Sequence, residues 1–461
     1  MQFLRSLSSS LIRLSMLTLV SVSAVHETAH GGAFRVLDQS ASATGQGTAF
    51  AAQADDPSAI QFNPAGMTQL EGVQFSGGTL FAGAKTKFRS ANGTKVEGTF
   101  GGTVAHPPPS HLYLTANLGY LTNEFWKDWT IGLGVTTPFG ISNEYPTDSQ
   151  VAQVAASVEL PLIDIKPTMA WKFNESLSVG AGLDIYTFAS FIGEGQAQFQ
   201  QTNPNPSSFT GIAPGTSLEA NGTDTALGYN ISLLWTPLRN NEGKPLVNMA
   251  FVYHSGADLN FRGQFLAGGA LVADTRTTIE LPNIFTGAIA IWPLRDEFHE
   301  WKVEVDVDYE DWSDFKDLNL NLSNGQAVPF SRKYDDAFVV MVGTEYVWLQ
   351  PSLLPDWEVA ARAGYAYSES PIPSSTFEPG VPDSAYSAPS FGLGFLCRQG
   401  GAFLGLVSCD GFGVKAIGVD LAYQVRLYQT RGVSNNINGA LINGEWDTTI
   451  HIGTFTLRLN F

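Results

Sequence analysis

The stretch from Trp301 to Trp312 reads WKVEVDVDYEDW, and apolar and charged residues alternate along it. Successive side chains of a β-strand point to opposite faces, so this period of two predicts a strand with one apolar and one charged face. The charged face would carry Lys302, Glu304, Asp306, Asp308 and Glu310. A soluble sheet with a solvated face produces the same pattern, so the other strands must decide between that sheet and a membrane barrel.

The chain ends on HIGTFTLRLNF, residues 451–461, and continues the same alternation to its last residue. Phe455, Leu457, Leu459 and Phe461 would share one apolar face. A terminal strand of an ordinary globular core is one explanation. A final aromatic residue on an apolar strand face is typical of outer-membrane barrels, and we expect Phe461 to be the assembly signal that the barrel-assembly machinery recognises.

Period-two segments recur along the whole chain and number about fourteen. They cover residues 73–88, 109–121, 129–139, 163–173, 177–190, 226–236, 247–262, 276–291, 301–312, 336–349, 357–368, 389–397, 414–428 and 450–461. An even number suits a single-chain bacterial barrel, and the connections alternate between mostly short turns and long polar loops. The predicted fold is therefore all-β, a transmembrane antiparallel β-barrel with both termini in the periplasm.

Composition agrees with a barrel and excludes other classes. Charged residues make up 15% of the chain, against roughly 25% in an average globular protein. The net charge is −18 and the 25 basic residues form no run, so we expect no nucleic-acid partner. No phosphate-binding loop occurs, and no cofactor is expected. Aromatic residues near strand ends, among them Trp126, Trp235 and Trp312, predict a belt at the membrane interface.

The N-terminus is typical of an exported protein. Arg5 and Arg13 stand before a short apolar core at residues 14–22, and small residues follow this core up to Ala24. The core is too short to span a bilayer as a helix. We predict a signal peptide over residues 1–24, with Ala29 as an alternative cleavage site, and the outer membrane of a Gram-negative bacterium as the location.

Residues 25–72 show no strand alternation and are rich in Ala, Gly, Ser and Gln. Asp55-Asp56-Pro57-Ser58 resembles the start of a helix. A barrel of this circumference has a wide lumen, which leaks solutes unless something fills it. We therefore predict three parts: the signal peptide, a hatch or plug over residues 25–72, and the barrel over residues 73–461.

Several short motifs occur in a fixed order along the mature chain. They are GAFRV at 32–36, GQGTA at 45–49, Asp55-Asp56, NPAG at 63–66, TPFG at 137–140, DYEDWSDF at 308–315, GYAY at 364–367, SPIP at 370–373 and the terminal Phe461. In this order they resemble the FadL/TodX family of outer-membrane transporters for hydrophobic compounds. The insertion that carries the cysteines departs from that family pattern.

The resemblance implies a plugged barrel that takes hydrophobic molecules from outside and releases them sideways through a gap at a kinked third strand. That strand contains Gly132, Gly134 and Pro138, followed by Phe139 and Gly140. Glycine inside a strand weakens the ladder, and proline removes a donor. The alternative is that Gly132 and Gly134 only give the hatch room to pack.

Ligand contacts are expected from apolar residues of the hatch and loops, such as Phe34, Phe50 and Phe62. Arg35 or Lys333 would meet a carboxylate, although both are more typical of ordinary solvated or hatch-packing side chains. From the resemblance, Asn63, Pro64 and Ala65 would form a gating turn of the hatch. Expected partners are fatty acids or aromatic hydrocarbons, together with outer-membrane lipids and lipopolysaccharide, and the chain is expected to be a monomer.

Cys397 and Cys409 are the only cysteines of the chain. A sparse, even count in an exported protein predicts a disulfide. A pair of metal thiolates is the alternative, but no further ligand stands nearby to complete a tetrahedral site. The connection that holds them lies on the side of the short turns and is nevertheless long.

Three other functions compete with transport of hydrophobic molecules. A general diffusion porin would share the barrel but would lack the hatch. An outer-membrane lipid hydrolase would need a nucleophile motif, and no Gly-x-Ser-x-Gly elbow occurs, so we expect no enzyme. A structural or adhesive barrel is the third alternative.

Overall fold

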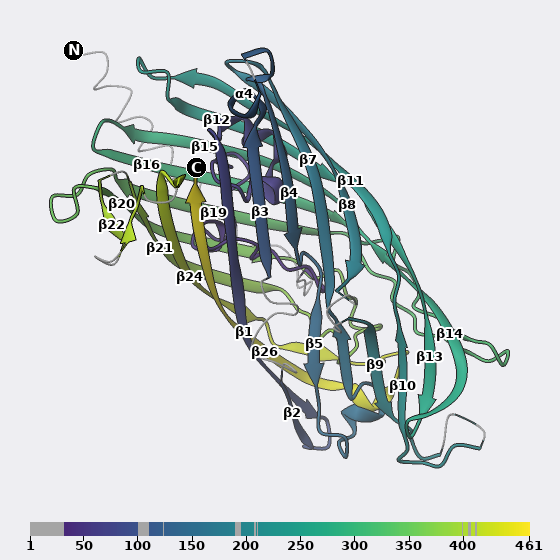
Figure 1. Cartoon of the computed structure of the whole chain (residues 1–461). Coiled ribbons are helices and arrows are strands. Elements are labelled where there is room, and N and C mark those ends of the chain that lie inside the picture. The colour runs from purple at the N-terminus through teal and green to yellow at the C-terminus, as the bar shows by residue number, and fades with distance from the viewer. Residues whose placement is uncertain are drawn as a thin grey trace.

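The computed structural model of the chain is a single closed barrel (Figure 1). It describes residues 32–99, 110–122, 124–189, 195–206, 209, 211–398, 400–403, 407–410 and 413–461. The predicted signal peptide lies outside these residues.

The barrel has fourteen antiparallel strands, several of which are divided into two segments. The wall consists of β1 (Val73–Ser90), β3 (His111–Asn117), β4 (Trp129–Thr136) with β5 (Ile141–Glu144), β6 (Ser157–Leu160) with β7 (Leu162–Asn174), β8 (Leu177–Phe188) with β9 (Ala197–Thr202), β10 (Ser217–Gly222) with β11 (Ala226–Arg239), β12 (Pro245–His254) with β13 (Ala257–Ala267), β14 (Ala270–Leu281) with β15 (Asn283–Arg295), β16 (His299–Asp311), β19 (Ala337–Trp348), β20 (Trp357–Ser368), β21 (Tyr386–Cys397), β24 (Ala416–Tyr428) and β26 (Gly444–Asn460). The last strand pairs with the first from Gln74↔Asn460 to Ser90↔Gly444 and closes the barrel. The predicted fold class is confirmed.

Short additional elements lie at the two ends of the barrel. The strands are β2 (Lys95–Thr99), β17 (Leu320–Leu322), β18 (Ala327–Val328), β22 (Ala402–Phe403), β23 (Val407–Ser408) and β25 (Arg431–Val433), and the helical turns outside the lumen are α4 (Leu118–Leu121), η2 (Glu124–Trp126), η3 (Val151–Gln153) and η6 (Ala440–Ile442). We call the end where Phe461 lies the turn end and the opposite end, which carries β2 and β9, the loop end (Figure 1).

The alternation of the sequence matches the two faces of the wall. On β16 the even-numbered side chains from Lys302 to Glu310 are buried and point inward, whereas Val305 and Val307 are exposed on the outer face. On β26, Thr454 and Thr456 point inward and Phe455 outward. Apolar residues therefore cover the outside, where they meet hydrocarbon, and polar residues line the inside.

Residues 32–72, which we call the inner segment, lie within the lumen and include α2 (Ala41–Thr44), α3 (Ala59–Phe62) and η1 (Pro64–Gln69). Inward-facing side chains from different sides of the wall bind it. The Ala41 N–H donates to Thr456 of β26 (3.0 Å), the Ala65 N–H to Ser232 of β11 (2.9 Å), and the Ala52 N–H to Glu304 of β16 (2.6 Å). The inner segment therefore crosses the barrel.

Some predicted boundaries are wrong. Residues 118–121 form a helical turn instead of strand, because the Asn117 side chain caps it by accepting from the Gly119 N–H at 3.0 Å. The predicted loop 191–225 contains the hairpin β9–β10, and β26 begins at Gly444 instead of residue 450. The loop-end strands extend past the alternating segments, so their mixed polarity hides them from a period-two search.

Candidate ligand cavity and its wall

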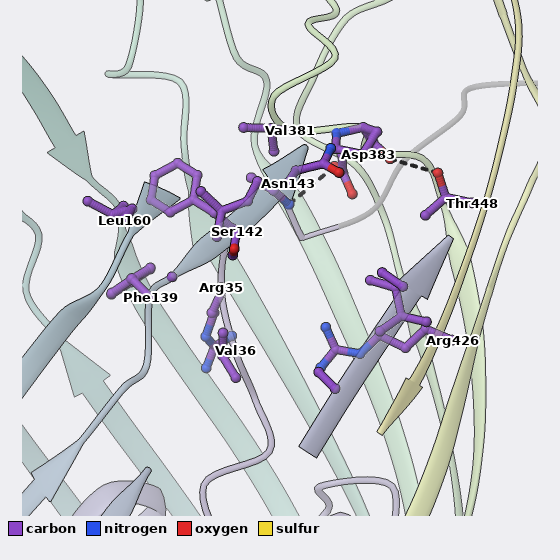
Figure 2. Close-up of a pocket in the computed structure, with 18 of the residues that line it drawn as sticks. Arg35, Val36, Phe139, Ser142, Asn143, Leu160, Val381, Asp383, Arg426 and Thr448 are labelled. Carbon is purple, nitrogen blue, oxygen red and sulfur yellow. Dashed lines mark hydrogen bonds between the residues drawn. The ribbon is translucent and has the colours of Figure 1, made fainter. Parts of the chain in front are cut away.

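Two adjoining cavities lie inside the barrel toward the loop end. The larger has a volume of about 220 Å³ and the smaller about 110 Å³. Figure 2 shows the larger one, with Phe139 and Leu160 on one side and Arg426 and Thr448 on the other. Both cavities are lined by Phe34, Ile141, Glu159, Leu160 and Val381. The start of the inner segment therefore separates two parts of one mostly apolar space.

Phe34 is the centre of an aromatic cluster in this space. Its ring centroid lies 5.0 Å from that of Trp312 and 6.1 Å from that of Phe139. Phe139 in turn contacts Tyr186 (5.9 Å), and Trp312 contacts Tyr334 (6.0 Å). The prediction that Trp312 belongs to an interfacial belt is wrong, because this side chain is 1% exposed and its indole N–H donates to Glu310.

The third strand of the wall is interrupted beside this cluster. β4 ends at Thr136 and β5 begins at Ile141. Between them, the Val36 N–H donates to the carbonyl of Pro138 (2.8 Å), and the Gly140 N–H donates to that of Phe34 (3.0 Å). Gln39 completes the contact, since its side chain accepts from the Thr137 N–H (3.0 Å) and donates to the Thr137 carbonyl (2.9 Å). The inner segment thus replaces the neighbouring strand where strand three is broken.

The inward carboxylates of β16 hold the inner segment from the other side. Arg35 Nη1 lies 2.7 Å from Asp308 and 2.6 Å from Glu310. Asp306 accepts the N–H groups of residues 50 and 51, both at 2.9 Å, and Glu304 accepts those of residues 52 and 53 at 2.6 and 3.2 Å. A carboxylate is a strong acceptor for buried N–H groups, so β16 is the main anchor of the inner segment.

The predicted ligand residues divide into two groups. Phe34 and Arg35 line the larger cavity together with Phe139. Phe50 and Phe62 pack against each other at 5.6 Å, away from both cavities. Lys333 is exposed and lines neither cavity. Of the predicted ligand residues, the structure therefore brings only Phe34 and Arg35 to the apolar space.

The triplet Asn63-Pro64-Ala65 begins η1. The Asn63 side chain accepts from the Ala65 N–H (3.1 Å) and donates to the Ala51 carbonyl (2.7 Å). A Cβ atom at Gly180 would lie 2.4 Å from the Ala65 nitrogen, so β8 approaches this turn closely only because Gly180 has no side chain. The triplet connects two parts of the inner segment to the wall.

Gly132 and Gly134 lie within the regular pairing of β4 with β3 and β7. A Cβ atom at Gly132 would lie 2.7 Å from Cδ1 of Ile60, and one at Gly134 2.9 Å from Cγ2 of Ile60. Both glycines therefore give α3 room against the wall. The interruption of the strand begins beyond them, at Thr137.

A third, polar chamber of about 660 Å³ lies on the turn-end side of the inner segment. Its ionisable lining residues are Asp55, Asp56, Glu71, Arg295, Glu300, Lys302, Glu345, Glu358, Arg362, Arg398, Lys415 and Arg458. Phe461 is one of the lining residues of this chamber, and its N–H donates to the carbonyl of Val73 (2.8 Å). The inner segment thus separates an apolar space from a charged one.

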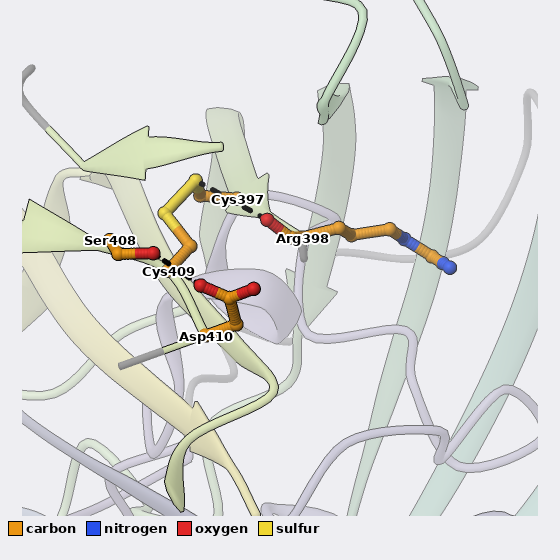
Figure 3. Close-up of a disulfide and its surroundings, with 5 residues drawn as sticks. All are labelled: Cys397, Arg398, Ser408, Cys409 and Asp410. Carbon is orange, nitrogen blue, oxygen red and sulfur yellow. Dashed lines mark hydrogen bonds between the residues drawn. A yellow bond between two sulfur atoms is a disulfide. The ribbon is translucent and has the colours of Figure 1, made fainter. Parts of the chain in front are cut away.

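Cys397 and Cys409 form a disulfide beside the charged chamber (Figure 3). Both cysteines are fully buried. Arg398, which follows Cys397, forms an ion pair with Glu358 of β20. The insertion is therefore fixed to the wall at its first residue.

Two ion pairs and one further carboxylate around the cavities were missed by sequence reasoning. Arg426 pairs with Asp38, Arg332 pairs with Glu378 (2.7 Å), and Asp383 lines the larger cavity. Most of them stand in loops or in the inner segment, where no periodicity marks an inward side chain. A motif search had no signal with which to find them.

Two features are absent from the part of the chain that the structure describes. No group of three or more His, Cys, Asp or Glu residues is arranged there to hold a metal ion. None of the helices there is long and apolar enough to cross a membrane.

Comparison with known sequences gives one family. The profile of the family described as "Outer membrane protein transport protein (OMPP1/FadL/TodX)" matches residues 22–400. A long-chain fatty acid transport protein of Salmonella typhi is 23% identical over 394 residues, covering 79% of this chain and 84% of that protein. Outer membrane protein P1 of Haemophilus influenzae is 23% identical over 390 residues, covering 74% and 78%.

Comparison with solved structures gives the same fold. A FadL homologue of Pseudomonas aeruginosa matches with a TM-score of 0.71 at 16% identity, over 93% of this chain and 100% of that one. The toluene transporter TodX of Pseudomonas putida matches with a TM-score of 0.60, also at 16% identity and with the same coverage. The resemblance that the motifs predicted is confirmed, and the family implies an outer-membrane location. The chain belongs to the OMPP1/FadL/TodX family of outer-membrane transport proteins.

Proposed function

We propose that this protein takes up hydrophobic molecules, of the class of fatty acids or aromatic hydrocarbons, and releases them sideways into the membrane at strand three. One observation carries the proposal. Phe34, Arg35 and Val36 line the larger cavity and also occupy the interruption of strand three. A cargo molecule that displaces these residues would also uncover the break in the wall.

The cavities suit an apolar cargo. A cavity of about 150 Å³ lined by aliphatic and aromatic side chains is enough to bind benzene, and the larger cavity here has about 220 Å³. Apolar surface gains roughly 25 cal/mol for each Å² removed from water. Release into the bilayer keeps that gain, so the last step needs no energy source.

The inner segment favours this function over a general porin. Buried residues from Ala41 to Met67 cross the lumen between the apolar cavities and the charged chamber. A porin needs a continuous aqueous path through this space. We infer that the inner segment acts as a hatch, with the loop end facing the outside.

The names of related proteins support the substrate range. Curated relatives are named long-chain fatty acid transport proteins, and solved structures of the same fold are titled toluene transporters or a monoaromatic hydrocarbon channel. Both classes are hydrophobic, which the cavity lining also requires.

A reversible cross-link between the inner segment and strand three tests the proposal. Arg35 and Phe139 face each other in an antiparallel bridge. They form a non-hydrogen-bonded pair, and the two Cα atoms of such a pair lie about 4.5 Å apart. That distance is compatible with a disulfide. In the double variant Arg35→Cys and Phe139→Cys, oxidation should stop cellular uptake of radiolabelled toluene and oleate, and reduction should restore it.

The control is the same double variant kept reduced, with the wild-type protein taken through both treatments because it has its own disulfide. Undiminished uptake by the oxidised variant would show that strand three and the inner segment need not separate, and lateral release at this place would be wrong.

A further inference from the structure

The positive charges of the two apolar cavities are already neutralised. Among the described residues, the cations that line these cavities are Arg35, Arg332 and Arg426. Arg35 pairs with two carboxylates of β16, Arg332 pairs with Glu378 at 2.7 Å, and Arg426 pairs with Asp38. A buried guanidinium in such a pair has its charge satisfied before any ligand arrives.

Two further carboxylates line the cavities without forming an ion pair within the described chain, Glu159 and Asp383. Asp383 accepts from the Ala33 N–H (3.1 Å) and from the Ser370 hydroxyl (2.5 Å), while its Oδ1 is buried with no hydrogen-bond partner. Arg431 lies beside it and donates to its main-chain carbonyl (2.7 Å).

The balance of charge around the cavities is therefore negative. Six carboxylates surround them, against three lining arginines and the neighbouring Arg431. The six are Asp38, Glu159, Asp308, Glu310, Glu378 and Asp383. Even with Asp383 left out of the count, five carboxylates face four arginines.

We infer that these cavities select uncharged hydrophobic molecules, such as hydrocarbons and their alcohols or esters, over the carboxylate of a free fatty acid. The inference rests on the proposed function and names its substrate class. A buried carboxylate needs a cationic partner. An incoming fatty carboxylate would have to take an arginine from its present partner, which would leave that partner buried and unpaired.

One polar atom fits an uncharged ligand. Nη1 of Arg332 is buried and has no hydrogen-bond partner, although Nη2 of the same guanidinium pairs with Glu378. Arg332 lines the smaller cavity. A hydroxyl or carbonyl oxygen would accept from Nη1 without upsetting the charge balance, whereas a carboxylate would also be repelled by Glu378 and Glu159.

Two ligands with the same chain and different charge test the inference. Oleate and oleyl alcohol would be compared by equilibrium dialysis with the purified protein at about pH 8, where the carboxyl group is ionised. Oleyl alcohol should bind at least about tenfold more tightly, which is about 1.4 kcal/mol. Equal or tighter binding of oleate would overturn the inference, and binding of neither ligand would overturn the proposed function itself.

A gain of oleate binding tests the cause. Glu378→Gln releases Arg332 from its carboxylate, so oleate should bind about tenfold more tightly, or about 1.4 kcal/mol, with oleyl alcohol unchanged. Asp38→Asn releases Arg426 in the same way and is the second variant if the first fails to fold. The matched control is Glu358→Gln, which releases Arg398 at the charged chamber and should leave both affinities unchanged. Unchanged oleate binding in folded Glu378→Gln and Asp38→Asn protein would overturn the charge explanation.

Discussion

β16 and strand three both hold the inner segment, and they do so in opposite ways. β16 is paired with β15 and β19 along its length, and it holds the inner segment through side-chain carboxylates. Strand three is broken between Thr136 and Ile141, and it holds residues 34–36 through its own backbone. Releasing the inner segment at β16 breaks buried charge-assisted bonds, whereas releasing it at strand three frees a ladder that is already interrupted.

The largest effect should come from removing the anchor on β16. In the double variant Glu304→Ala and Asp306→Ala, four backbone N–H groups of residues 50–53 lose their acceptors. Each buried N–H left unpaired costs about 1–3 kcal/mol. The inner segment should detach from the wall, and planar bilayers should show large steady currents that the wild-type protein lacks.

The control for this loss is Val305→Ala on the same strand, whose side chain faces outward. It should leave the conductance at the wild-type level. A double variant that shows no such currents would mean that the inner segment stays in place without the carboxylates of β16. β16 would then not be its stronger anchor.

The strand of β16 could be predicted from the sequence, but its role could not. One face of the strand meets hydrocarbon and the other faces the lumen, and this difference produces the period-two pattern of the sequence. The acceptor role of Glu304 depends on an N–H group 252 residues away in the chain, and no local pattern reports such a contact. Trp312 was misplaced for a related reason, because a tryptophan at a strand end has the same local sequence whether it faces lipid or a cavity.

For strand three, too, the sequence predicts the local structure and not its partner. Proline and glycine in TPFG indicate a weak ladder, and the interruption lies at these residues. The partner that fills the interruption, Phe34 to Val36, could not be found without the fold. The ion pair of Arg332 with Glu378 at the loop end was missed, since loops carry no periodicity that relates these two residues.

The next effect concerns Phe34, whose ring packs against Trp312, which follows β16, and against Phe139, in the interruption of strand three. Replacing a buried phenylalanine by alanine costs about 3–5 kcal/mol. Phe34→Ala should join the two cavities, destabilise the inner segment and weaken toluene binding measured by equilibrium dialysis. Phe62→Ala removes an equal ring from a pair outside the cavities and should leave toluene binding unchanged. Equal binding by both variants would remove Phe34 from the ligand site.

A smaller effect is expected from Gln39, whose side chain binds Thr137 at the interruption of strand three. Gln39→Ala removes both hydrogen bonds to Thr137, at about 1–3 kcal/mol for each buried group left unpaired. Hydrogen exchange followed by mass spectrometry should show faster exchange at residues 137–140. The peptide that covers β16 is the internal control and should not change. If both peptides change together, the contacts at β16 and at strand three open as one cooperative unit and not separately.

The smallest effect separates the two explanations for the glycines of strand three. Gly132→Ala places a Cβ atom 2.7 Å from Cδ1 of Ile60, and overpacking of this kind costs about 1–3 kcal/mol, at the lower end where a flexible side chain gives way. Ile60→Val removes that Cδ1 atom, while Sδ of Met67 stays 2.8 Å from the new Cβ atom, so the double variant should recover part of the thermal stability that Gly132→Ala loses. Gly287→Ala, which meets nothing within 4 Å, should be neutral. If Ile60→Val restores stability and toluene uptake is normal throughout, Gly132 makes room for the inner segment, and the part of strand three that can open begins at Thr137. If uptake falls in the double variant although stability recovers, the flexibility of β4 itself contributes to the exit.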